Sequence, residues 1–252
     1  INNIKSKNIF AKVDTKIKDG SDKNLKIIDI NVEEKPTGEI SLGAGVGTSG
    51  GSIAGGIKEN NFLGKAIKLD TNLAISENTV KGKFSITKPN FNYSENDVSA
   101  SISSTTTDNL KESGYQTRNI GFGLGTSFEQ YDNLYFTPNL NASFEDLSTT
   151  SSASATLKKQ EGNYFDLNLP YTLKYNMTNR AYQPSEGYNM TWFQNLPLVS
   201  DSYEIVNGFE INKYQTFASD MVGKVSIFGR AANSMAGEDI RLSKRLYLPS
   251  NK

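Results

Sequence analysis

The chain has 252 residues, and its 27 lysines and arginines balance its 27 aspartates and glutamates, so the formal net charge is zero. No basic run stands out, which argues against a nucleic-acid partner. The sequence has neither cysteine nor histidine, which excludes disulfides, thiolate chemistry and histidine-based catalysis, and we expect no metal, no cofactor and no enzymatic activity.

The N-terminal part, residues 1–35, has the pattern of a small module of mixed helix and strand. Residues 1–10 are expected to form the tail of a helix. Residues 11–18 alternate between apolar and charged side chains, and residues 25–33 form a second predicted strand after the polar turn 19–22. A two-stranded hairpin is only marginally stable alone, so we expect the module to begin before the first residue of this sequence.

A period-two alternation is the main signal in the rest of the chain, residues 36–252. Between Tyr164 and Met177, apolar side chains alternate with Asp, Asn, Thr and Lys. Such a strand has one apolar and one polar face, and it is long enough to cross a bilayer when tilted. Only 36% of the residues are hydrophobic, as suits a barrel with a polar interior. No run of about 18 apolar residues occurs, so no transmembrane helix is expected.

The alternation predicts eleven strands, many of them longer than those of a soluble β-sandwich. We therefore predict an all-β chain, an antiparallel transmembrane β-barrel that is truncated and open. The predicted strands are Glu39–Thr48, Gly51–Glu59, Lys65–Ser76, Thr79–Thr87, Asp97–Thr106, Tyr115–Phe128, Asn133–Glu145, Asn163–Thr178, Tyr188–Leu196, Ser202–Gln215 and Met221–Arg230.

Aromatic residues gather near the predicted strand ends. In a membrane barrel they would form girdles at the two interfaces, although ordinary clustering of apolar residues near turns would look the same. These residues are Phe62, Phe91, Tyr93, Tyr131, Trp192 and Tyr203.

Several local sequences, taken in order, resemble the BamA family of outer-membrane assembly factors. They are Ile9–Val13, Val32–Gly38, Gly43–Gly47, Asn60–Gly64, Thr87–Phe91 and Arg180–Gly187. The resemblance implies that residues 1–35 are the end of the last POTRA module. It also implies that residues 36–252 are about the first eleven strands of a sixteen-stranded barrel. Leu242–Pro249 is similar to the lead-in to the family's inward-folded loop, whose motif is absent here, so a truncated barrel is expected.

The first predicted barrel strand is the candidate functional element. Gly43, Gly45 and Gly47 stand at alternate positions, and Gly55-Gly56 follows on the second strand. Glycine weakens a strand, which suits a seam that opens, but it suits a tight bend equally well. The resemblance implies that client strands bind along this edge, which comprises Glu39, Ile40, Ser41, Leu42, Gly43, Ala44, Gly45, Val46 and Gly47.

Two turns complete the candidate residues. Asn60, Asn61, Phe62 and Gly64 form the first, in which Asn and Gly suit positive φ angles. Arg180, Pro184 and Gly187 mark the second, and Arg180 either reaches an interior carboxylate or is a solvated turn charge.

The resemblance implies insertion of β-barrel proteins into the bacterial outer membrane, with the N-terminal part in the periplasm. The partners would be outer-membrane lipid, nascent outer-membrane proteins and periplasmic lipoproteins bound through POTRA modules. A secretion pore or porin-like channel is the alternative, because a polar interior fits it equally well. Catalysis by carboxylates such as Asp166 and Glu210 is a remote third reading, because the sequence does not place them together.

Overall fold

The computed structural model describes residues 4, 9–22, 24–47, 50–180, 183–218, 221–237 and 239–246. Parts of some predicted segments therefore lie outside the described residues. These parts are residues 1–3 and 5–8 of the expected helix tail, Thr48 at the end of the first barrel strand, Ala181 and Tyr182 in the second turn, and 247–252 at the chain end.

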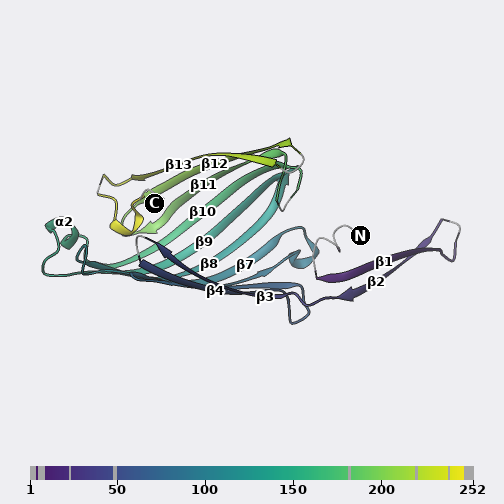
Figure 1. Cartoon of the computed structure of the whole chain (residues 1–252), viewed down its shortest axis with the longest axis horizontal. Helices are drawn as coiled ribbons and strands as arrows, with labels where there is room; N and C mark the ends of the chain where they lie inside the picture. Colours follow the sequence, from purple (N-terminus) through teal and green to yellow (C-terminus); the bar gives the residue numbers. More distant parts are fainter. Residues whose placement is uncertain are drawn as a thin grey trace.

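Two strands near the N-terminus form a hairpin of their own. Strand β1 (Phe10–Asp19) pairs in antiparallel fashion with β2 (Lys26–Glu34). Val13 lies opposite Val32 and Ile17 opposite Ile28, so one face of the hairpin is aliphatic, as the alternation predicts. The hairpin projects beyond the large sheet, at the right in Figure 1.

The other strands form one antiparallel sheet in which each strand pairs with its neighbours in the chain, from β3 at one edge to β13 at the other. The prediction of eleven strands is confirmed. The strands are β3 (Gly38–Gly47), β4 (Gly50–Phe62), β5 (Ile67–Ser76), β6 (Thr79–Lys88), β7 (Asp97–Asn109), β8 (Tyr115–Tyr131), β9 (Leu134–Thr149), β10 (Gly162–Thr178), β11 (Gly187–Ser200), β12 (Glu204–Ala218) and β13 (Met221–Ser234).

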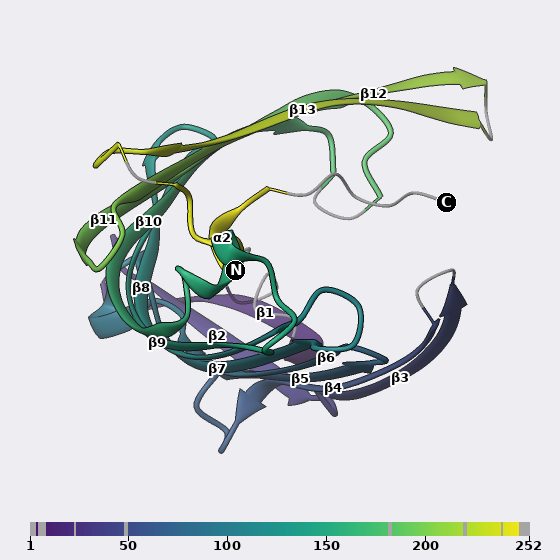
Figure 2. The same cartoon turned by 90° about the vertical axis from the view of Figure 1, so that its left-hand side faces the viewer.

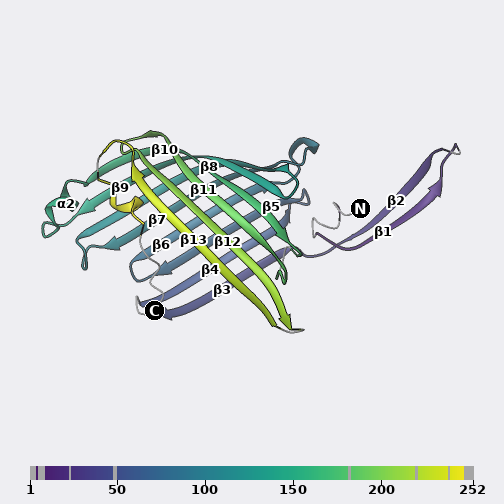
Figure 3. The same ribbon diagram turned by 90° about the horizontal axis from the view of Figure 1, so that it is seen from above.

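The sheet curls into an open trough, and Figure 2 shows β3 and β13 at its two free sides. Seen from above, its strands run obliquely across the molecule (Figure 3). The register between neighbouring strands shows which side chains share each face of the sheet. On the concave side Asn72, Lys83 and Ser103 lie in one cross-strand row, whereas on the convex side Phe84, Ile102 and Phe122 lie in another. The convex rings and aliphatic groups are substantially exposed, which confirms a sheet with an apolar outside and a polar inside.

The helical elements that the structure describes are short. The four-residue helix α2 (Ala155–Lys158) lies between β9 and β10, and its Leu157 amide donates to the Oγ of Ser154 at 3.3 Å. The 3-10 turns η1 (Phe91–Tyr93) and η2 (Leu242–Lys244) lie between β6 and β7 and after β13. In the described part of the chain, no helix has the length and apolar character needed to span a membrane.

The expected aromatic positions hold for five of the six residues. Phe62, η1 with its two rings, and Tyr131 lie at or just beyond strand ends, all at connections on the hairpin side of the sheet. Tyr203 lies between β11 and β12. The placement of Trp192 near a strand end is wrong. Because β11 continues to Ser200, Trp192 stands within the strand, opposite Leu173 and Phe209.

Candidate functional site at the edge of the sheet

Strand β3 is an edge strand of the described sheet. It pairs with β4 from Gly38 opposite Glu59 to Gly47 opposite Gly50, and no strand of the described residues covers its other side. Its convex-side residues are among the most exposed apolar side chains of the molecule: Ile40 is 82% exposed and Leu42 is 85% exposed. A row of backbone donors and acceptors is therefore available beside an apolar surface.

At Gly43 and Gly45 the concave side of β3 carries no side chains. A Cβ added at Gly43 would meet no atom within 4 Å, and one at Gly45 would meet only Ser52 Oγ, at 3.3 Å. Neither glycine has a positive φ. The strand therefore does not need glycine for its conformation or for space at Gly43, and what these residues contribute is the absence of cross-strand side-chain contacts.

The turn after β4 lies later in the chain than predicted. Asn60, Asn61 and Phe62 belong to β4, and the positive φ angles fall at Leu63, Gly64 and Ala66. The sequence reasoning missed a register shift between Glu59 and Phe62, which extends the strand past the two asparagines. Asn61 still organises the turn. Its carbonyl accepts the Gly64 amide at 2.9 Å, and its Oδ1 accepts the Ala66 amide at 2.8 Å.

The turn after β10 depends on two residues at its ends. Asn179 accepts the amides of Ser185 and Glu186 through its Oδ1, at 3.1 and 3.2 Å. Gly187 has a φ of 93°, and a Cβ there would lie 2.0 Å from the Met177 carbonyl oxygen, so glycine is required. Arg180 is exposed, with no ion pair to any described residue, and Pro184 is half-buried.

A buried ionic cluster on the concave face was not predicted. Arg241, which follows β13, is 2% exposed. Its Nη2 lies 2.5 Å from Asp166 Oδ2 on β10, and its Nε lies 3.8 Å from Glu145 Oε1 on β9. Lys244 Nζ lies 3.0 Å from the same Asp166 oxygen. Asp166 is therefore close to Glu145 and two cations, and not to Glu210, which accepts from Asn212.

Further contacts attach this segment to four parts of the concave wall. The Arg241 amide donates to Glu204 Oε1 at 3.1 Å, and the Leu242 amide donates to Gln160 Oε1 at 2.9 Å. The guanidinium of Arg241 also stands 4.3 Å from the centre of the Tyr164 ring. Ser243 Oγ donates to Glu145 Oε1 at 2.7 Å. These partners are 37 to 98 residues away along the chain, which explains why no local pattern revealed them.

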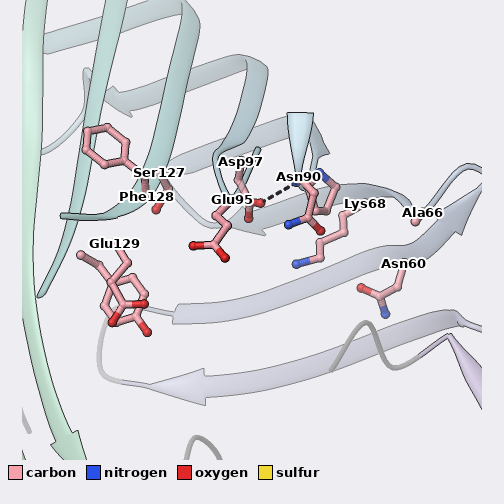
Figure 4. A pocket seen from close by; sticks show the side chains of 11 residues that line it. Asn60, Ala66, Lys68, Asn90, Glu95, Asp97, Ser127, Phe128 and Glu129 are labelled. Atoms are coloured by element: carbon pink, nitrogen blue, oxygen red, sulfur yellow. Dashed lines mark hydrogen bonds between the residues drawn. The ribbon is translucent and has the colours of Figure 1, made fainter. Parts of the chain in front are cut away.

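A pocket of about 370 Å³ lies at the hairpin side of the concave face (Figure 4). Its wall carries Lys68 from β5, Glu95 and Asp97 near the start of β7, and Glu129 from β8. The Asn90 amide donates to Asp97 Oδ1 at 3.2 Å across its rim. Within the described ranges, no group of three or more acidic residues is placed to hold a metal ion. The pocket is a charged recess on the concave face.

The chain was compared with known proteins. A family model described as the Omp85 superfamily domain matches residues 61–248. No curated protein sequence matches the chain.

Solved structures share the fold. BamA from Haemophilus ducreyi lacking POTRA domains 1–3 superposes with a TM-score of 0.78 at 21% identity, over 96% of this chain and 50% of that one. CdiB from Acinetobacter baumannii superposes with a TM-score of 0.55 at 11% identity, over 92% of this chain and 46% of that one. The chain therefore spans about half the length of each of these structures.

Proposed function

Because this chain belongs to the Omp85 superfamily, we propose that it forms part of an outer-membrane machine that inserts β-barrel proteins, with β3 as the strand that receives the client. The concave face would then line the lumen, and the convex face would contact lipid. The N-terminal hairpin would lie in the periplasm as the end of a POTRA module, where periplasmic lipoproteins would bind.

The position of β3 as the first strand of the sheet carries this proposal, because its outer side pairs with no strand of the described residues. Lipid cannot satisfy backbone N–H and C=O groups, and each unpaired group in hydrocarbon costs several kcal/mol. An incoming strand that pairs with β3 satisfies both edges at once. Such pairing demands little of the client's side chains, because the main chain supplies the hydrogen bonds. An edge of this kind can serve many clients.

The glycines of β3 suit a temporary pairing between β3 and the client strand. A client that pairs with β3 must be released when its own barrel closes. The missing side chains at Gly43 and Gly45 limit the cross-strand contacts that would hold a partner in place. Backbone pairing then dominates both capture and release.

Cysteine crosslinking in the native membrane tests the proposal. The sequence has no cysteine, so each introduced thiol is unique. We expect Ser41→Cys on β3 to form a disulfide with a cysteine in the terminal strand of a client stalled during assembly. Ser101→Cys, within β7 and with paired strands on both sides, is the matched control.

A crosslink at position 41 that does not exceed the one at position 101 would contradict the proposal. The same result would favour the alternative of a transport channel, because a pore needs no client strand beside β3. The two functions are thus separated by a single pair of variants.

A further inference from the structure

We propose that the lipid-facing side of β4 holds one acyl chain of a membrane phospholipid in a hole centred on Gly55. The inference rests on the proposed location in a membrane. The hole is a pocket of about 430 Å³ that spans β3, β4 and β5. Six aliphatic side chains dominate its wall: Ile40, Leu42, Ile53, Ile57, Leu73 and Ile75.

The register of the three strands places Gly55 at the centre of this wall. Gly55 lies opposite Leu42 on β3 and opposite Leu73 on β5. Along β4, the neighbouring positions on the same face are Ile53 and Ile57, because side chains alternate between faces. All four nearest positions carry branched aliphatic groups, and the central one carries none.

Neither the backbone nor crowding requires a glycine here. A Cβ at Gly55 would make only ordinary contacts, with Leu42 Cδ1 and Ser41 O, both at 3.6 Å. At the next residue the situation differs, because a Cβ at Gly56 would lie 2.7 Å from Asn72 Oδ1. Gly56 is needed for space on the lumen side, whereas the space above Gly55 is open to a group from outside the protein.

A hydrocarbon chain is the occupant that fits this hole. No charged residue lines it, and Thr71 is the one polar side chain of its lining that stands on this face, because Ser41 lies opposite Gly56 on the lumen side. Gly55 lies five residues after the start of β4 at Gly50 and seven before its end at Phe62, which is the middle of a spanning strand. At that depth a lipid presents its acyl chains and not its headgroup.

An acyl chain bound in this hole would pack against Leu42, and it would therefore contact strand β3 on its convex face. Leu42 is 85% exposed and Leu73 is 49% exposed, so burial of both offers a gain that the bare protein lacks. The lipid would strengthen the β3–β4 pair from the convex side without occupying the edge to which the client binds.

Photolabelling in lipid nanodiscs tests whether an acyl chain binds in the hole above Gly55. The whole protein is reconstituted with a phospholipid that carries a diazirine midway along one acyl chain, irradiated and mapped by peptide mass spectrometry. We expect labelling of Ile53, Ile57 and Leu73 to exceed several-fold the labelling of Ile102. Ile102 faces lipid in the same way, but its two cross-strand neighbours, Phe84 and Phe122, both carry large side chains.

A filled variant adds a second readout. Gly55→Leu should reduce the labelling of Leu73 to the level of Ile102. Ser104→Leu, on the same face three strands farther on in β7, should leave the labelling of Leu73 unchanged. Equal labelling of Leu73 and Ile102 in the parent protein, or undiminished labelling of Leu73 in Gly55→Leu, would overturn the acyl-chain seat alone. Absence of labelling at all of these residues would overturn the membrane location as well.

Discussion

Arg241 Nη2 lies 2.5 Å from Asp166 Oδ2, although 75 residues separate the two side chains along the chain. Both side chains are 2% exposed, so the pair is held away from water. The contact ties the segment after β13 to the wall formed by β9 and β10. Figure 2 shows this segment, in yellow, inside the curl of the sheet.

Loss of Arg241 should destabilise the fold strongly. Arg241→Met leaves the carboxylates of Asp166 and Glu145 buried with only Lys244 for compensation, and breaking a buried pair costs about 3–5 kcal/mol. Urea unfolding in detergent micelles, followed by tryptophan fluorescence, measures the change. Arg180→Met is the matched control, because Arg180 is exposed, and it should unfold near the parent midpoint. An unchanged midpoint in Arg241→Met would refute the prediction.

Replacing both Arg241 and Asp166 should lower the free energy of unfolding by less than the sum of the two single replacements. Asp166→Asn in the Arg241→Met background no longer leaves a charge buried at position 166, so part of the lost stability should return. The double-mutant cycle uses the same urea midpoints. Strictly additive losses would show that Arg241 and Asp166 do not interact energetically.

Gly187→Ala should destabilise the turn after β10. Its φ of 93° is unfavourable for alanine, and the new methyl group would lie 2.0 Å from a carbonyl oxygen. Strain of this kind costs about 1–3 kcal/mol. Gly64→Ala is the control. Gly64 also has a positive φ, 67°, but a Cβ there meets no atom within 4 Å, so the loss should be smaller. Equal losses in thermal unfolding would contradict the steric explanation.

Gly43→Val should stiffen the edge strand without harm to the fold. Glycine weakens a strand by about 0.5–1 kcal/mol, and valine fits at this open position, where a Cβ would meet no atom within 4 Å. Hydrogen exchange of the amides in β3 should therefore slow by roughly two- to fivefold. If β3 receives clients, their insertion rate should fall in the same variant. Gly82→Val, at an open position of β6, should affect neither quantity.

The strands were predictable because their information is local. In β10, the alternation from Tyr164 to Met177 covers nearly the whole observed strand, Gly162–Thr178. The boundaries failed where the pattern was interrupted. The asparagines at 60 and 61 suggested a turn, but pairing with β5 resumes beyond them, at Phe62 opposite Ile67. A register shift of this kind depends on the partner strand, which a single strand's pattern does not contain.

The ionic cluster around Arg241 could not be predicted from local sequence patterns, for a different reason. Glu145 and Asp166 look like any other polar positions that alternate with apolar ones. Only the curl of the sheet brings Arg241 back onto them, across separations of 75 residues and more. The client-binding role of β3 came from the resemblance to the BamA family and stays a prediction, whereas the hole above Gly55 needed the register of three strands.

The contrast between the two sides of the sheet implies a gradient of local unfolding. Segment 239–246 links β9, β10 and β12 by buried contacts, so these strands should open together and late as one cooperative unit. Strand β3 is held on one side only, by a glycine-rich partner. Thermal fluctuations should therefore detach β3 first while the clamped strands persist. Subglobal opening of this kind would free backbone at an edge that a second polypeptide can reach.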